Sequence, residues 1–407
     1  MQENAPGTGE NMERLYDRDP YLREFEATVT DCRKGKDGYE IYLDRTAFYP
    51  EGGGQPPEGG MLGGVRILDV QETEAGICHY AEGPLTPGER VRGILDWKNR
   101  FSNMQQHTGE HIVSGLIHRQ YGYHNVGFHM GRTEMTIDLS GELTWEQLME
   151  IEREANQVVW ENRPVQVTYP SEDELKTLEY RFKKELTGPI RIVEIQGADC
   201  CACCGTHVAR TGEIGCIKFL SMIHYKGGVR ISMLCGMEAL FDYEARTEQM
   251  QEMSVLLSAK TDGIAAAIRQ LKQENARKDG EIGTLRRRLM DLIAEGYPEQ
   301  EGGLSVFEPE LSPVQVRQLA DLLLEKQKGS VVLVCSGSEG SYSYCVGSRV
   351  LDVRETGKWL NGRLNGRGGG NARMVQGTFQ ARKEEIETAF HEAEIIKKPE
   401  AEGGYGA

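Results

Sequence analysis

Short runs in which hydrophobic and polar residues alternate fill the chain from residue 19 to residue 97. Turn-forming residues separate these runs, which are Phe25–Val29, Tyr39–Leu43, Val65–Val70 and Val91–Leu95. Alternation with a period of two is typical of strands that bury one face, and short strands at this spacing favour a small antiparallel barrel or sandwich. We therefore expect an N-terminal β-barrel over residues 19–97, after a flexible polar leader over residues 1–18.

One loop of this region, Phe48–Pro56, contains three consecutive glycines, Gly52–Gly54. Glycine tolerates positive φ angles and lets a backbone approach its neighbours closely. The glycines therefore either shape a wide hairpin turn or bring the backbone against a ligand or another strand. The sequence leaves both interpretations open.

A helical pattern replaces the alternation after residue 98. The three- and four-residue spacing predicts a helix over Asn99–Tyr123. A second helix is expected to begin after Thr144, an N-cap with Gln147 three residues on, and to end near Asn162. Strand-like runs follow at residues 190–195, 214–220 and 229–234. Residues 98–240 are therefore expected to form an α+β domain.

Between residues 241 and 298 a heptad-like stripe takes the place of the strand pattern. Its apolar positions keep a four-three alternation: Ile264, Ile268, Leu271, Ile282, Leu285, Leu289 and Leu292. Asn275 and Lys278 occupy the intervening a and d positions, and a buried Asn can fix the register of a coiled coil. A helical hairpin or coiled coil fits this stripe, and so does an amphipathic helix lying on a neighbouring domain.

An α/β unit is expected over residues 299–400. Its pattern predicts a helix over Pro313–Lys326, a buried strand over Val331–Cys335 and a last helix over Arg382–Ile395. The predicted fold class is thus α+β and multidomain: a small N-terminal barrel, an α+β domain, a helical or coiled-coil arm and a C-terminal α/β domain.

Within that last unit, a loop is expected from Asn361 to Gly377. It interleaves Arg363, Arg367 and Arg373 with glycines. Backbone freedom combined with guanidinium groups suits a segment that holds phosphates, and a solvated linker is the alternative.

The 407 residues include 47 Lys and Arg against 63 Asp and Glu, a net charge of −16. This balance disfavours general affinity for nucleic acid, because non-specific phosphate binding depends on Lys and Arg, but it permits a local basic surface. No run approaches the about 20 apolar residues of a membrane helix, and the first residues lack a signal-peptide pattern. We therefore expect a cytoplasmic protein with no membrane partner.

Two pairs of candidate metal ligands stand far apart in the chain. His107 and His111 lie four residues apart on a predicted helix, which places both imidazoles on one face. Cys203 and His207 offer a thiolate and a third imidazole with the same separation. Three nitrogens and one sulfur match a tetrahedral zinc site, so the sequence predicts one zinc ion per chain.

Other interpretations of the same residues stay open. Four of the ten cysteines crowd together, and Cys200 with Cys203, or Cys201 with Cys204, forms a Cys-x-x-Cys pair suited to redox chemistry or a closed zinc knuckle. The segment from His107 to His111 also matches the inverted zinc-peptidase motif, with Glu110 as general base. Each alternative leaves part of the His and Cys pairs unexplained.

Three motifs together carry a resemblance to a known family. They are Asn103–His111, then Cys203–Val208 with Thr211–Gly215, and Phe48–Pro50 with Gly52–Gln55. In this order they resemble the freestanding alanyl-tRNA editing proteins called AlaX, relatives of the editing domain of alanyl-tRNA synthetase, in the long form of the family. The family often has Gly where Cys204 stands, so a second thiol that could compete as ligand adjoins the metal site.

The resemblance implies hydrolysis of the ester that joins serine, and sometimes glycine, to tRNA for alanine. By position in the family's motif, Thr46 is implied as the group that hydrogen-bonds the serine side chain, with Gln55 nearby. Asp199 would orient a histidine ligand or accept the substrate's amino group, unless it is an ordinary turn carboxylate. His129 would line the same pocket, unless it is structural. Zinc would activate water or orient the aminoacyl end.

The C-terminal unit is similar to the DHHA1 domain that follows the editing domain in the synthetase. The residues that carry this resemblance are Gly368, Gly369 and Gly370 with Gln376–Gly377. The resemblance implies that these glycines, with Arg363, Arg367 and Arg373, bind the mischarged tRNA. It further implies nucleotide and ATP binding and a homodimer through the helical arm or the C-terminal domain. This segment carries more Arg and fewer consecutive glycines than the usual form.

Overall fold

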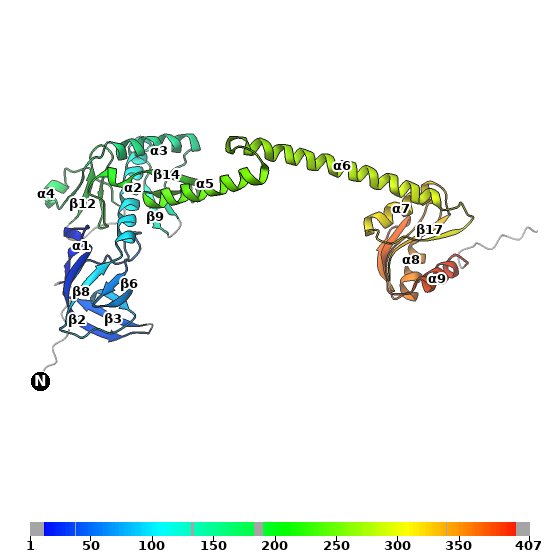
Figure 1. Ribbon diagram of the computed structural model, residues 1–407, viewed down its shortest axis with the longest axis horizontal. Helices are drawn as coiled ribbons and strands as arrows, with labels where there is room; N and C mark the ends of the chain where they lie inside the picture. Colours follow the sequence, from blue (N-terminus) through cyan, green and yellow to red (C-terminus); the bar gives the residue numbers. More distant parts are fainter. Residues whose placement is uncertain (1–11, 37, 132–133, 183–189, 339, 396–407) are drawn as a thin grey trace, which may run out of the picture. The chain divides into compact units, whose positions relative to one another are not determined.

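The computed structural model describes residues 12–36, 38–131, 134–182, 190–338 and 340–395. It divides into two compact units, Met1–Met253 and Ser254–Ala407, and each has its own architecture. Both units contain helices and sheets (Figure 1), so the expected mixed, multidomain architecture is confirmed. Among the helices of the described ranges, none is long and apolar enough to cross a membrane.

The first unit begins with a closed barrel whose strands are neighbours in the order β2, β3, β7, β6, β5, β8. Their bounds are β2 (Glu24–Lys34), β3 (Tyr39–Leu43), β5 (Gly60–Leu62), β6 (Val65–Thr73), β7 (Gly76–Ala81) and β8 (Arg90–Leu95). On β2, Phe25, Ala27 and Val29 are buried, whereas Glu24 and Glu26, which alternate with them, are exposed. The period-two pattern thus fills the barrel with every second residue.

The N-terminal segment differs from the expected leader. Residues 12–18 belong to the fold: β1 (Glu13–Arg14) pairs with β4 (Arg45–Thr46), and α1 (Leu15–Arg18) follows. Tyr16 is buried and packs edge-on against Tyr49, with ring centroids 5.2 Å apart. This aromatic contact holds a segment that looks polar in the sequence, and residues 1–11 lie outside the described residues.

A long central helix, α2 (Trp97–Tyr121), connects the barrel to the α+β part of the first unit. It begins at Asp96, whose side chain accepts a hydrogen bond from the Asn99 backbone, and ends at Gly122 in the left-handed conformation. Every residue from Ser102 to Ile117 is buried. Its polar side chains therefore need partners inside the protein, since a buried polar group without one is costly.

Two sheets and a second helix surround α2. The four-stranded sheet has the order β14-β15-β10-β9, and a smaller one has the order β11-β12-β13. Helix α3 (Trp145–Trp160) has the predicted capping box between Thr144 and Gln147. The remaining bounds are β9 (Asn125–Met130), β10 (Met135–Leu139), β11 (Val165–Thr168), α4 (Glu172–Leu175), β12 (Ile192–Ile195), β13 (Asp199–Ala202), η2 (Thr211–Ile214), β14 (Ile217–Tyr225) and β15 (Gly228–Cys235).

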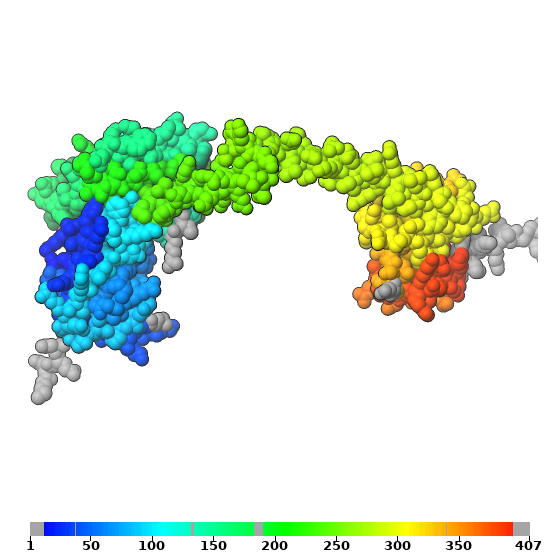
Figure 2. All heavy atoms as spheres, viewed as in Figure 1, coloured from blue at the N-terminus to red at the C-terminus, as the bar shows by residue number. Residues whose placement is uncertain are grey.

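The chain continues through α5 (Met237–Leu257) and η3 (Thr261–Gly263) into α6 (Ile264–Gly296). Within the second unit, α6 packs near its C-terminal end, where Met290 and Ala294 join the core. Figure 2 shows the rest of α6 extending as a rod from the bulk of the second unit, and its heptad stripe stays exposed from Ile268 to Leu292. Gly280 and Gly283 do not interrupt the helix.

The second unit is a five-stranded sheet in the order β16-β17-β18-β20-β19, with helices packed against it. Its bounds are β16 (Gly303–Phe307), α7 (Pro313–Glu325), β17 (Val331–Ser338), β18 (Ser341–Ser348), α8 (Arg354–Arg363), β19 (Arg367–Gly370), β20 (Met374–Phe379) and α9 (Lys383–Ile395). The expected helices and buried strand are present here.

The prediction of a loop over residues 361–377 is wrong. This segment contains the end of α8, strand β19 and the start of β20. Gly368 pairs with Gly377, and a Cβ on Gly368 would lie 2.7 Å from the Tyr344 hydroxyl oxygen. The Tyr344 ring stacks on Phe379 at a centroid distance of 3.8 Å. These glycines therefore make room for a paired edge strand and an aromatic stack, a need that composition does not reveal.

Candidate metal centre

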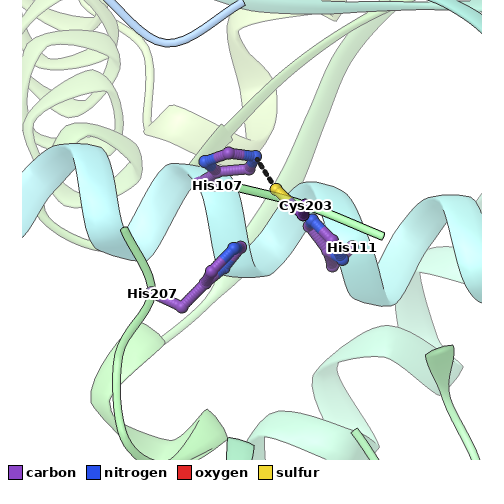
Figure 3. A group of neighbouring side chains, drawn as sticks. All are labelled: His107, His111, Cys203 and His207. Carbon is purple, nitrogen blue, oxygen red and sulfur yellow. Dashed lines mark hydrogen bonds between the residues drawn. The ribbon is translucent and has the colours of Figure 1, made fainter. Parts of the chain in front are cut away.

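Four side chains converge beside α2: His107, His111, Cys203 and His207 (Figure 3). The two histidines of α2 project from one face of the helix, and the other two residues come from the segment after β13. One ligand atom from each lies within 4.8 Å of the others, and His107 Nε2 is 3.5 Å from Cys203 Sγ. The structure thus brings together the two sequence pairs that the spacing singled out.

Small residues allow this close approach. Gly115 lies one turn after His111, and a Cβ there would be 2.2 Å from the Ala198 carbonyl oxygen, so β13 can pass against α2. A Cβ on Gly205 would lie 2.1 Å from His107 Cε1. Glycine is the only residue that fits at both positions without a shift of the backbone or the histidine.

Each histidine is oriented by a hydrogen bond from its Nδ1 atom. Gln55 Oε1 is 3.0 Å from His107 Nδ1, and Asp199 Oδ2 is 2.8 Å from His111 Nδ1. Thr108 Oγ1 lies 3.4 Å from His207 Nδ1, and because this hydroxyl donates to the Met104 carbonyl, it accepts from the ring. All three rings therefore carry a proton on Nδ1 and turn their Nε2 atoms towards one point.

His207 Nε2 is buried and has no hydrogen-bond partner among the described residues. Burial lowers the pKa of His207 to about 3, and the nearby His107 adds to this effect, so the ring is neutral. A neutral, unpartnered imidazole nitrogen that points at a thiol and two further imidazoles is suited to a metal ion.

Cys203 is the only one of the four that is partly exposed. Loss of hydration disfavours its thiolate, but His107 and His111 lower its pKa well below the ordinary value. The adjacent Cys204 is exposed and does not join the group, so the structure presents Cys203 as the thiol that meets the histidines. All ten cysteines are free, which includes both Cys-x-x-Cys pairs.

A second layer of side chains, formed by Asp199 and Arg181, positions His111. Arg181 donates to both oxygens of Asp199, from Nε at 2.7 Å and from Nη2 at 2.8 Å. Burial opposes the charge on Asp199, but the bonds from His111 and Arg181 lower its pKa below the ordinary value. Asp199 therefore stays ionised and holds His111. Sequence reasoning missed Arg181, because only the backbone pairing of Arg181 with Cys201 brings this segment to the site.

Glu110, the general base of the peptidase alternative, is buried in the same helix. Its Oε1 accepts hydrogen bonds from Ser114 and Asn125, and its Oε2 lies 4.0 Å from His111 Nε2. His111, Asp199 and Cys201 also form a compact group, but both Asp199 oxygens are already engaged by Arg181 and by His111 Nδ1. Cys201 is buried there, and burial raises the pKa of its thiol above the ordinary range.

The glycine-rich loop delivers Gln55 to the cluster. Gly53 and Gly54 have positive φ angles of 62° and 90°, and Gly52 and Gln55 exchange two backbone hydrogen bonds. A Cβ on Gly54 would lie 2.5 Å from Phe128, whose ring stacks on His107 at 5.4 Å. The loop is thus a tight turn that also approaches another strand closely, and Gln55 is a positioning residue for His107.

The other predicted site residues lie elsewhere in the first unit. Thr46 is fully buried at the barrel, where its hydroxyl meets His79 Nε2 at 2.8 Å. His79 is a partner that the sequence did not single out. His129 is exposed on β9, next to Phe128 in the strand and therefore on the opposite face. The structure does not bring His129 to the four ligands.

The three arginines that the sequence analysis singled out in the second unit lie in two different environments. Arg363 forms an ion pair with Glu392 at 3.0 Å and lies over the Trp359 ring. Arg367, Arg373 and the three glycines of β19 are exposed at the sheet edge. The guanidinium groups therefore do not surround one loop but border a short strand.

Comparison with known proteins relates this chain to proteins that act on tRNA for alanine. Residues 190–232, which include Cys203 and His207, match the family described as threonyl and alanyl tRNA synthetase second additional domain. The chain is 33% identical over 282 residues to the mouse alanyl-tRNA editing protein Aarsd1, covering 65% of this chain and 68% of that protein. It is 34% identical over 383 residues to alanine–tRNA ligase of Methanoregula boonei, covering 89% of this chain but 41% of the ligase.

The alanyl-tRNA editing protein AlaX-L of Pyrococcus horikoshii matches over a greater length. Identity is 31% over 395 residues, which cover 92% of this chain and 96% of the relative. A likeness of this extent covers nearly the whole of both chains. The chain therefore belongs to the AlaX family of alanyl-tRNA editing proteins, in its long form.

Proposed function

We propose that this protein is a zinc-dependent aminoacyl-tRNA deacylase that acts in trans on tRNA for alanine carrying serine or glycine. The observation that carries the proposal is the convergence of three Nε2 atoms and one Sγ, with each Nδ1 proton held from outside by Gln55, Asp199 or Thr108. This donor set fits zinc, and family membership supports an editing role.

The need for such an enzyme follows from the energetics of amino acid selection. A site shaped for alanine cannot exclude the smaller glycine by size, and it discriminates weakly against a single added hydroxyl. A second site must therefore hydrolyse the wrong esters and spare the correct one. The names of the relatives, alanyl-tRNA editing proteins, match this division of labour.

In the proposed reaction, His107, His111, His207 and Cys203 would hold a zinc ion. When bound there, zinc would supply a Lewis acid for ester hydrolysis. The rings cannot rotate away, because Gln55 and Asp199 hold two of them and Thr108 holds the third. Cys203 is the partly exposed ligand, which places the open approach on its side.

A different class of function also has an observation in its favour. Four protein ligands are typical of a closed structural zinc site, whereas catalytic zinc keeps a position open. A noncatalytic tRNA-binding protein with structural zinc would show the same four residues.

One experiment separates the two functions. Hydrolysis of Ser-, Gly- and Ala-tRNA for alanine is measured with the wild type, the chelator-treated protein and His107→Ala, alongside zinc content. We expect the wild type to hydrolyse Ser-tRNA and to spare Ala-tRNA, and both other samples to lose this activity. His118→Ala is the matched control, since His118 lies on α2 and its ring bonds the Tyr123 carbonyl instead of the cluster. Zinc and tRNA binding without hydrolysis would favour the noncatalytic function.

The second unit is proposed to bind the body of the tRNA. Arg367 and Arg373 flank the exposed glycines of β19. Because these glycines have no side chains, a phosphate can approach the backbone of the strand between the two guanidinium groups. Arg363 contributes less, because it is paired with Glu392. Replacing one phosphate-binding arginine should reduce the slope of log affinity against log salt concentration by about one unit.

The protein is further proposed to form a homodimer through α6. The stripe is exposed over about seven helical turns, and it has the four-three spacing by which two helices pack side by side.

A further inference from the structure

Arg191 is a buried cation that lies against the segment carrying Cys203 and His207. It directly precedes β12, and only 6% of its surface is exposed. The β12–β13 ladder ends with the pair Ile192 and Ala202, so Arg191 stands opposite Cys203 where the chain leaves this sheet. A buried guanidinium group is costly unless its N–H groups find acceptors. The acceptors of Arg191 therefore show which part of the chain it holds.

Those acceptors are backbone atoms of the turn Cys203–Gly205. Arg191 Nη1 donates to the Cys203 carbonyl at 2.7 Å and to the Gly205 carbonyl at 3.1 Å. The Arg191 backbone carbonyl accepts from the Cys203 N–H at 3.1 Å. One residue thus holds both peptide groups of Cys203 and the carbonyl two residues further on. The turn is fixed at its two ends, with Cys204 between them.

The fixed turn places two adjacent thiols in different surroundings. Cys203 Sγ points at the histidines (Figure 3), 3.5 Å from His107 Nε2, and accepts a hydrogen bond from the Gly205 N–H at 3.4 Å. Cys204 is exposed and takes no part in the group of four. Rotation of the peptide groups between the two cysteines would change which thiol points inwards. Hydrogen bonds to the carbonyls on both sides of Cys204 oppose that rotation.

We propose that Arg191 is a positioning residue that selects Cys203 over Cys204 as the thiolate ligand of the metal centre. This inference rests on the proposed function, in which three histidines and one thiolate hold zinc. The bonds of Arg191 to the turn end on backbone atoms, so it acts on the metal through the conformation of the turn. Without them, the turn can rotate and either thiol can reach the ion.

Cobalt(II) in place of zinc reports whether a thiolate is bound, because a sulfur-to-cobalt charge-transfer band then appears in the near ultraviolet. We expect Cys203→Ser to lose this band and Cys204→Ser to keep it. The double variant Arg191→Met/Cys203→Ser should regain the band, because Cys204 can then reach the metal. Adding Cys204→Ser should remove it again. A band that stays absent from Arg191→Met/Cys203→Ser would overturn the inference.

Zinc affinity gives the size of the effect. Residues that orient metal ligands typically contribute about 10–100-fold to affinity, so the ratio of the losses in Cys203→Ser and Cys204→Ser should fall by about that factor in Arg191→Met. Arg191→Lys keeps a charged donor and should restore part of the ratio. Arg230→Met is the matched control, since its guanidinium bonds Asp138 instead of the turn. An unchanged ratio in Arg191→Met, meaning purely additive losses, would contradict the selection.

A further measurement needs no variant and so does not depend on how the variants fold. Zinc-loaded wild-type protein is treated with iodoacetamide, and the modified cysteines are located by mass spectrometry. We expect Cys204 to react and Cys203 to be protected, and the reverse pattern would overturn the inference.

The outcomes separate this inference from the function on which it rests. A wild type that binds neither zinc nor cobalt would overturn the metal centre and the inference together. Zinc binding with the expected cysteine pattern but no hydrolysis of Ser-tRNA would contradict only the deacylase and would support the role of Arg191.

Discussion

Arg100 and Glu58 form a buried ion pair that joins α2 to the barrel. Their side chains are 0% and 2% exposed, and Arg100 also donates to the carbonyls of Pro20 and Ala47. Glu58 in turn accepts from the Tyr49 backbone, so the pair anchors the segment that leads to Gln55 and His107. The pair thus connects barrel stability to the placement of the metal ligands.

Replacing one partner should therefore destabilise the first unit. Arg100→Met leaves the Glu58 carboxylate buried without its cation, which should lower the free energy of unfolding by about 3–5 kcal/mol. Urea denaturation measures the change. Arg119→Met is the control, because Arg119 on the same helix pairs with Glu154 at the surface and should cost about 1 kcal/mol or less. Similar losses for both variants would contradict the anchoring role.

Arg181 and Asp199 should determine zinc affinity without touching the metal themselves. Arg181→Met removes both bonds that hold Asp199, so His111 loses its orientation, and affinity should fall about 10–100-fold. Competition with a chromogenic chelator gives the dissociation constant. Arg163→Met is the matched control for Arg181→Met, since the Arg163 guanidinium bonds Glu161 and the Gln196 carbonyl instead of Asp199. Unchanged affinity in Arg181→Met would rule out this second layer.

The glycines of β19 should differ in their tolerance of a side chain. A Cβ on Gly368 would lie 2.3 Å from the Gln376 carbonyl oxygen, whereas a Cβ on Gly369 meets nothing within 4 Å. Gly368→Ala should therefore lower the melting temperature of the second unit, and Gly369→Ala should not. If Gly369→Ala nevertheless weakens tRNA binding, the strand itself contacts RNA. Equal thermal effects would show that the edge strand does not pack against β20 and Tyr344.

His79 should make the protein less stable in acid. The pKa of His79 is about 4 in the fold, because burial disfavours the charged ring, against about 6.5 when unfolded. Between these values the unfolded chain binds the extra proton, so stability rises with pH and is lost as pH falls from 6.5 to 4, by up to about 3 kcal/mol. Urea denaturation at pH 4.5 and 7 checks this. His79→Gln should lack this component, and an identical pH dependence would contradict it.

The stripe on α6 should govern the oligomeric state. Leu285→Glu or Leu289→Glu places a charge in the proposed helix pair, so sedimentation should report a monomer where the wild type is a dimer. Arg287→Glu changes the charge of the same helix off the stripe and should leave the dimer intact. A monomeric wild type would end the proposal.

Much of the local structure could be predicted from the sequence. The capping box at Thr144, the alternation along β2 and the four-residue spacing of His107 and His111 are short-range signals, since each depends on residues two to four positions apart. The segment from Asn361 to Gly377 was not predictable in this way. Its glycines make room for Tyr344, a residue of another strand, and this cause leaves no trace in the local pattern.

The sequence by itself singled out the candidate metal ligands: three imidazoles and a thiol in two pairs of matching separation. Only the tertiary structure decided that Cys203 rather than Cys204 joins them, that Gln55 and Asp199 set the proton on each of two rings, that Arg181 holds Asp199, and that His79 meets Thr46. The physical reason is distance along the chain. Side chains that orient a ligand act over about 3 Å in space, whereas Gln55 is 52 residues and Asp199 88 residues away from the histidine it holds.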